Sequence, residues 1–173
     1  MLSVRKRVYP LVERAFATSS LCADITRPWG APGRLVFVCT GNICRSPYAE
    51  FVARARGLNA ISCGTHTTAD LPADAVAIAE AARRGVDLQP HRTSRWQDVQ
   101  LNNNDIVIAT QLRHFFSVLP RAREANCRVA LMSSLLLPQF NVVWDPYGRE
   151  PQAYVHAFEL IDRAVGKIAQ LVT

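Results

Sequence analysis

The most reactive side chains of this protein stand together in one short stretch, Cys39-Thr40-Gly41-Asn42-Ile43-Cys44-Arg45-Ser46-Pro47. Five residues separate Cys39 from Arg45, so a looped segment can bring a thiolate and a guanidinium to opposite sides of one phosphate group. Arginine offers a bidentate fork that matches two phosphate oxygens. A thiolate at a helix N-terminus beside an arginine is stabilised as the nucleophilic anion. The stretch therefore predicts a phosphate-binding loop that carries its own nucleophile, with the Ser46 hydroxyl as a further donor to the thiolate.

The flanking sequence supplies the elements that such a loop needs. Leu35 to Val38 is a short apolar run typical of a buried strand. Gly41 and Asn42 tolerate a positive φ and permit a tight loop. Ser46 is a predicted N-cap for a helix over Pro47 to Arg56, with proline at the first helical position. A strand, a loop and a helix in this order direct backbone N–H groups toward a bound anion.

A second signature, Val143-Trp144-Asp145-Pro146-Tyr147-Gly148, lies late in the chain. A cysteine nucleophile displaces an aryloxide slowly unless a general acid protonates the leaving oxygen. Pro146 biases Asp145 toward an extended conformation, which projects its carboxyl group from a loop. An Asp-Pro pair alone is a common turn signal, but together with the phosphate loop it predicts a general acid.

The nine-residue stretch resembles the phosphate loop of the low-molecular-weight protein tyrosine phosphatases, and the resemblance covers about residues 34–172. It implies that Cys39, Arg45 and Asp145 are catalytic and that protein phosphotyrosine is hydrolysed through a cysteinyl-phosphate, with no metal or other cofactor. Bacterial relatives often act on tyrosine kinases of polysaccharide export. The resemblance implies the same kind of substrate for this chain. It also implies a set of substrate-binding residues: Thr40, Gly41, Asn42, Ile43, Cys44, Ser46, Trp144 and Tyr147.

Three alternative functions are weighed against this one. Arsenate reductases resemble the same fold and loop, but they need a further cysteine pair near the third strand, and no such pair follows Ser94. Protein-arginine phosphatases carry threonine where this chain has Ile43, so phosphotyrosine is favoured. A phosphate-binding module without turnover would not need the nucleophile, the arginine and the acid together.

Three positions depart from the family pattern and leave the substrate preference open. Gln111 stands where many members carry an acidic residue. The rim loop over 67–71 lacks a bulky aromatic residue, and 148–150 lacks a second tyrosine beside Tyr147.

The rest of the domain alternates predicted strands and helices. Strands are expected over 59–63, 105–110 and 127–132, and helices over 73–84, 111–119 and 153–171. This order predicts a single α/β domain over 34–173, with a four-stranded parallel sheet covered by helices on both faces, a Rossmann-like three-layer fold. The phosphate loop falls at the carboxyl end of the first strand, where such folds bind ligands. His91 is expected to hold loops together, and Cys63 and Cys127 to be buried core residues.

Residues 1–33 form a basic N-terminal extension and linker. Residues 1–34 have a net charge of +4, whereas the whole chain has +6. The extension is expected to be either a poorly ordered leader or an amphipathic helix around Val4 to Phe16 that touches anionic lipid or a partner. An odd number of cysteines, five, argues against a disulfide framework and for a reducing, cytoplasmic compartment. No apolar run approaches a membrane span, and no nucleic-acid partner is expected.

Cys44 has two interpretations. In the first, it is the partner of Cys39 in a reversible disulfide that protects the nucleophile from over-oxidation. Alternatively, it fills space beneath the loop.

Overall fold

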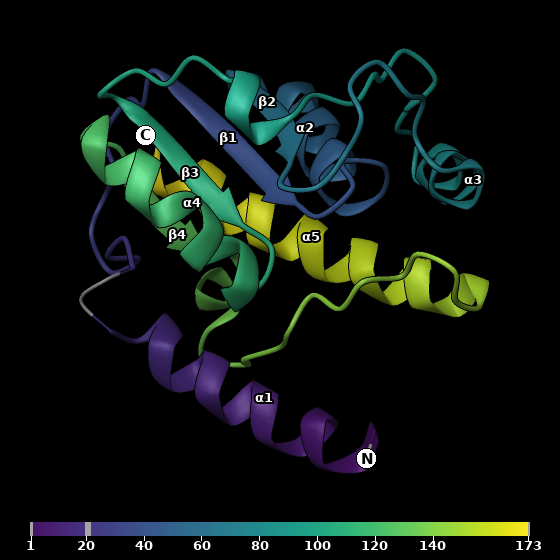
Figure 1. Cartoon of the computed structure of the whole chain (residues 1–173), viewed down its shortest axis with the longest axis horizontal. Coiled ribbons are helices and arrows are strands. Elements are labelled where there is room, and N and C mark those ends of the chain that lie inside the picture. Colours follow the sequence, from purple (N-terminus) through teal and green to yellow (C-terminus); the bar gives the residue numbers. More distant parts are fainter. Residues whose placement is uncertain (1, 20–21, 173) are drawn as a thin grey trace.

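The computed structural model describes residues 2–19 and 22–172 and shows a parallel sheet between two layers of helices (Figure 1). The strands run in the order β2-β1-β3-β4, with bounds β1 (Arg34–Cys39), β2 (Ala60–Gly64), β3 (Asp105–Ala109) and β4 (Arg128–Leu131). The helices are α1 (Leu2–Ala17), α2 (Arg45–Ala55), α3 (Ala75–Arg83), α4 (Leu112–Glu124) and α5 (Pro151–Leu171). Two 3-10 turns complete the elements, η1 (Trp96–Asp98) and η2 (Met132–Leu136). The predicted four-stranded parallel α/β fold is confirmed.

Alternate residues of each strand face opposite cores, because successive strand side chains point to opposite faces. Leu35 and Phe37 of β1 pack in the core that α2 and α5 cover. Val36 and Val38 of β1 pack in the second core, which contains Phe115 of α4. Both faces of β1 are therefore buried, as the continuous apolar run predicted, and its carboxyl end with Cys39 is held rigidly.

Several predicted helix boundaries are wrong: α3 begins at Ala75 rather than at residue 73 and α5 at Pro151 rather than at residue 153, and the errors in α2 and α4 have a structural reason. Helix α2 begins at Arg45 with Cys44 as N-cap, not at Pro47 with Ser46 as N-cap. The Ser46 hydroxyl does not cap the helix because it hydrogen-bonds within the phosphate loop. Helix α4 continues past the predicted end at residue 119 and through Pro120, since the turn beyond the proline buries Ala122 in the core.

The N-terminal extension forms a helix over Leu2–Ala17. Helix α1 lies along the edge of the molecule, below α4 and the loop that leads to α5 (Figure 1). Ala17 of α1 and Cys22, which follows it, are buried in the same core as α4. None of the helices in residues 2–19 and 22–172 is long and apolar enough to cross a bilayer.

Candidate active site

The Cys39 side chain lies at the carboxyl end of β1 and accepts hydrogen bonds from the loop that follows. The Asn42 backbone N–H donates to Cys39 Sγ at 3.2 Å, and Ser46 Oγ lies 3.0 Å from the same sulfur. Asn42 Nδ2 donates to Ser46 Oγ at 2.9 Å. The amide occupies the acceptor side of this hydroxyl, whose proton is shared between the sulfur and the Cys63 backbone oxygen at 3.3 Å. These donors stabilise a thiolate at this position.

Asn42 fastens the phosphate loop to the elements behind it. Its φ of 53° lies in the left-handed region, where asparagine is among the better-tolerated residues. Its side-chain oxygen accepts from the Ser94 N–H at 2.8 Å, and its backbone oxygen lies 2.7 Å from His91 Nε2. Burial lowers the pKa of His91, so the ring is neutral and Nε2–H donates to Asn42. The predicted structural role of His91 is confirmed.

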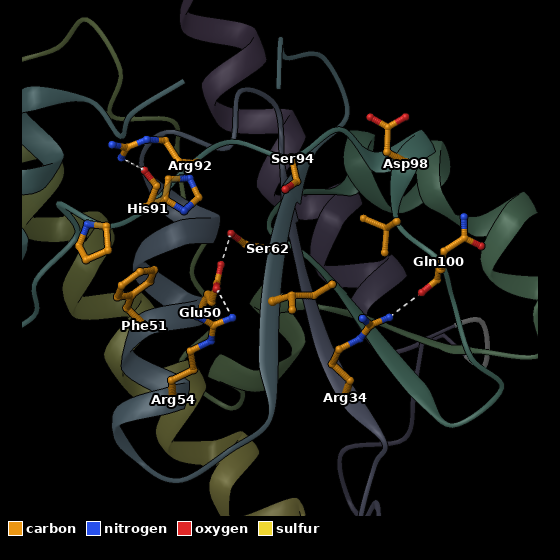
Figure 2. Close-up of a pocket in the computed structure, with 13 residues that line it drawn as sticks. Arg34, Glu50, Phe51, Arg54, Ser62, His91, Arg92, Ser94, Asp98 and Gln100 are labelled. Atoms are coloured by element: carbon orange, nitrogen blue, oxygen red, sulfur yellow. Dashed lines mark hydrogen bonds and ion pairs between the residues drawn. The ribbon is translucent and has the colours of Figure 1, made fainter. Parts of the chain in front are cut away.

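A cavity of about 390 Å³ lies behind the loop. Cys39, Arg45 and Asp145 are not among the residues that line it. Figure 2 shows Ser62 of β2 beside Glu50 and Arg54 of α2 at this cavity. Asn42 Nδ2 donates to Ser62 Oγ, which donates to Glu50 Oε2 at 2.6 Å. The cavity is thus lined by the hydrogen-bond network that supports the loop from behind.

Gly64 at the end of β2 allows the loop to approach the sheet closely. A Cβ atom at this position would lie 2.6 Å from the Thr40 backbone oxygen. Since real Cβ atoms do not come that close to backbone oxygens, a side chain at Gly64 would displace the phosphate loop.

The Arg45 guanidinium is buried and held on one side by three acceptors. Nη1 donates to Gln111 Oε1 at 2.9 Å and to the Val143 backbone oxygen at 3.3 Å, and Nη2 pairs with Asp145 Oδ2 at 2.6 Å. In the part of the chain that the structure describes, the buried Arg45 Nε has no hydrogen-bond partner. A buried, unpaired donor is costly. A phosphate oxygen is the natural acceptor for it.

Asp145 reaches the phosphate loop from the segment before α5. Its Oδ2 also lies 3.5 Å from Arg113 Nη2, so two arginines face the carboxylate. Trp144 packs against Tyr9 of α1, with ring centroids 5.4 Å apart, and Tyr147 is exposed at the rim. The ion pair with Arg45 therefore brings Asp145 to the loop that carries Cys39, although Asp145 is distant in the sequence.

The predicted substrate-binding residues of the phosphate loop divide into two groups. The side chains of Asn42, Cys44 and Ser46 are buried and support the loop. Thr40, Gly41 and Ile43 are partly accessible beside the nucleophile.

His114 is a site residue that the sequence did not indicate. Its Nε2 lies 2.8 Å from Thr40 Oγ1 of the phosphate loop, and its Nδ1 lies 2.9 Å from Thr110 Oγ1. Arg113 Nε donates to His114 Nε2, which fixes this nitrogen as the acceptor. Burial, followed by the charge of Arg45, lowers the pKa of His114 to about 2, so it joins α4 to the loop as a neutral ring.

His114 predicts a pH dependence of stability. The unfolded histidine takes up a proton below about pH 6.5, whereas the folded one does so only near its pKa of about 2. The unfolded state binds more protons between these values, so stability falls as the pH falls, by up to about 1.4 kcal/mol per pH unit. Denaturant unfolding at about pH 5 and about pH 7 should therefore show a smaller loss in His114→Asn than in the wild type. The control is His156→Asn on an exposed face of α5; equal losses in all three proteins would contradict the assignment.

A cysteine and an arginine in one loop at the carboxyl end of β1, with an aspartate opposite, define the class of α/β proteins that have a cysteine-based phosphate loop. A family model described as low molecular weight phosphotyrosine protein phosphatase matches residues 34–173. The chain belongs to this family. It is 33% identical over 132 residues to the low molecular weight protein-tyrosine-phosphatase Etp of Escherichia coli K12, covering 75% of this chain and 88% of Etp. It is 30% identical over 136 residues to the probable phosphatase EpsP of Ralstonia nicotianae, covering 76% of this chain and 90% of EpsP.

Solved structures share the fold. Vibrio vulnificus Wzb in complex with benzylphosphonate superimposes with a TM-score of 0.69 at 28% identity, covering 81% of this chain and 99% of Wzb. The YwlE arginine phosphatase from Geobacillus stearothermophilus also gives 0.69, at 24% identity, covering 80% of this chain and 92% of YwlE. The fold by itself therefore does not distinguish phosphotyrosine from phosphoarginine.

Proposed function

We propose that this protein hydrolyses phosphotyrosine in proteins through a cysteinyl-phosphate intermediate. The observation that carries the proposal is the ion pair of Asp145 with Arg45 at 2.6 Å, because it places an acid at the mouth of the loop that holds Cys39. The unpaired Arg45 Nε supports it by offering a phosphate oxygen a buried donor.

In the first step the substrate phosphate replaces Asp145 as the partner of the Arg45 guanidinium. Phosphate oxygens accept from Nε and Nη2 and from N–H groups at the start of α2, which have no intrahelical partners. Asp145, released from Nη2, lies beside the leaving oxygen in its protonated form. The Cys39 sulfur forms a bond to phosphorus, the bond from phosphorus to the phenolic oxygen breaks, and that oxygen takes the proton of Asp145.

In the second step water hydrolyses the intermediate. The Asp145 carboxylate accepts a proton from water as its oxygen attacks phosphorus. The sulfur–phosphorus bond breaks, phosphate leaves, and Cys39 returns as a thiolate stabilised by the Asn42 N–H and the Ser46 hydroxyl. Arg45 and the backbone donors balance the phosphate charge throughout, so the steps written here use only this chain's own groups.

Phosphotyrosine is favoured by the similarity to Etp and EpsP, a protein-tyrosine-phosphatase and a probable one, and by Ile43, whose side chain lies next to Gly41 in the phosphate loop. The test is turnover of an aryl phosphate, a phosphotyrosine peptide and a phosphoarginine peptide of the same sequence. Preference for phosphotyrosine is expected. Faster release of phosphate from phosphoarginine would make phosphoarginine, not phosphotyrosine, the substrate class. No release from any of the three substrates would overturn the proposed phosphatase function.

Oxidation should inactivate the enzyme reversibly through Cys39 and Cys44. Peroxide converts the Cys39 thiolate to a sulfenic acid, and attack by the Cys44 sulfur forms a disulfide and releases water. All five cysteines are free in the structure, and burial raises the pKa of the Cys44 thiol, so its proton must pass to the departing sulfenic hydroxyl as the sulfur attacks. After peroxide and then dithiothreitol, the wild type and the control Cys127→Ser should recover more activity than Cys44→Ser.

Mass spectrometry of the oxidised wild type provides the second measurement. A Cys39–Cys44 peptide linkage is expected. Equal recovery of all three proteins without that linkage would mean that Cys44 only packs beneath the loop.

A further inference from the structure

Helix α1 presents two different faces. The outer face carries Val8, Leu11 and Val12, which are exposed. The inner face carries Tyr9, Glu13 and Phe16, spaced by four and three residues, as one side of a helix requires. Phe16 anchors this face to α4, with ring centroids 5.1 Å from Phe115 and 4.9 Å from Phe116.

Glu13 supplies a cap that α4 does not supply for itself. Gln111 is the N-cap residue of α4 and makes no side-chain capping bond, because its oxygen accepts from Arg45 instead. The Leu112 N–H donates to Glu13 Oε2 at 3.2 Å. A carboxylate at this end of α4 also faces the positive end of the helix dipole. Helix α1 thus frees Gln111 to bind the phosphate-loop arginine.

The Glu13 carboxyl group is fully buried, so it is more than a surface contact. Burial raises its pKa, and the hydrogen bond from the Leu112 N–H and the charge of Arg45 oppose that rise. Leu112 begins α4 directly after Gln111, which binds Arg45. Because the charge of Arg45 acts on this buried carboxyl group, Glu13 is part of the electrostatics of the site.

The residues at the start of α4 contact the groups that the proposed reaction uses. Gln111 holds Arg45, Arg113 faces Asp145, and His114 contacts Thr40 of the phosphate loop. Fixing the end of this helix therefore fixes three contacts to the site at once.

Tyr9 contacts a different segment of the site, the one that carries Asp145. Its ring packs on Trp144, the residue directly before Asp145, with centroids 5.4 Å apart at an interplanar angle of 43°. Aromatic pairs in this distance range stabilise their arrangement by about 0.5–1.5 kcal/mol. The contact limits the movement of the segment that carries the acid.

We propose that α1 is a positioning element of the active site, in which Glu13 orients the Gln111–Arg45 pair and Tyr9 orients the Trp144–Asp145 segment. The part assigned to Tyr9 rests on the proposed phosphatase function, whereas the part assigned to Glu13 requires only that the loop binds phosphate. This extension precedes residue 34, where the match to the family model begins, so it is an addition to the shared fold.

Binding of inorganic phosphate, measured by calorimetry on the full chain, tests Glu13. Glu13→Ala should weaken binding about tenfold. Glu13→Gln keeps an oxygen that can accept from Leu112 and should bind within about threefold of the wild type, as should the outer-face control Leu11→Ala. Circular dichroism at the assay temperature verifies that each variant is folded. Unchanged binding in a folded Glu13→Ala, or an equal loss in Glu13→Gln, would overturn the capping role.

Turnover of aryl phosphates with different leaving groups tests Tyr9. Tyr9→Leu keeps an apolar side chain but loses the ring contact. It should slow substrates with poor leaving groups about tenfold and activated ones about twofold. Equal kcat values for Tyr9→Leu and the wild type on poor leaving groups would overturn its role. A wild type that binds phosphate but hydrolyses none of these esters would refute the proposed function, and the Glu13 measurement would still decide whether α1 positions Arg45.

Discussion

Cys39→Ser is expected to lower turnover of aryl phosphates by at least about 10³-fold while leaving phosphate affinity within about threefold of the wild type. A serine hydroxyl is a far weaker nucleophile than a thiolate at neutral pH, and the groups seen to hydrogen-bond Cys39 Sγ are donors rather than bases. The Asn42 N–H and the Ser46 hydroxyl face the sulfur. Arg45 and the start of α2 are untouched by the change, so the anion cradle survives.

The measurement pairs steady-state turnover with calorimetric binding of phosphate. Cys127→Ser is the matched control, because its thiol donates to the Asn102 backbone oxygen at the amino ends of β3 and β4, opposite the end of the sheet that carries the phosphate loop. Residual activity within about tenfold of the wild type would remove Cys39 from the nucleophile role. Loss of phosphate binding in a folded Cys39→Ser would mean that the sulfur also holds the cradle together.

The phosphate loop could be predicted from the sequence because its determinants are local. The apolar run before Cys39 specifies β1, and the residues that follow it permit a tight turn into α2. The position of the helix start was wrong by two residues for a tertiary reason. Ser46, a good N-cap by type, is bonded to Cys39 and Asn42 instead.

Other contributions to the site are long-range and have no local signature. Glu13 lies near residue 112 only because α1 folds against α4, and the exposed stripe of α1 gives no hint of the buried carboxyl group on its other face. Gln111 was noted only as a departure from the family pattern. A usable signal did exist for Gln111 and His114: both follow β3 directly, and ligand sites in such folds lie at the carboxyl ends of the strands.

Helix α1 also contributes to holding Asp145, the proposed general acid. Asp145 pairs with Arg45, and its neighbour Trp144 is held by Tyr9. The acid is therefore positioned by contacts on both sides, one inside the domain of residues 34–173 and one from the extension.

Asp145→Asn is expected to slow aryl phosphates with poor leaving groups by about 10²–10⁴-fold, the usual contribution of general acid catalysis. Activated phenolates leave without protonation and should lose much less in the first step. The change also removes the ion pair with Arg45 Nη2, so Arg45 no longer has to exchange a carboxylate for the substrate phosphate. Phosphate affinity should therefore be equal to that of the wild type or higher.

The decisive measurement is a plot of log kcat/KM against the leaving-group pKa for the wild type and for Asp145→Asn, because kcat/KM reports the first, bond-breaking step. A much steeper negative slope is expected for the variant. Asp70→Asn is a matched control, since Asp70 is exposed in the rim loop and has a φ of 69° that asparagine also tolerates; its slope should equal that of the wild type. Parallel lines for Asp145→Asn and the wild type would show that the carboxyl group does not protonate the leaving oxygen, whatever the size of the loss.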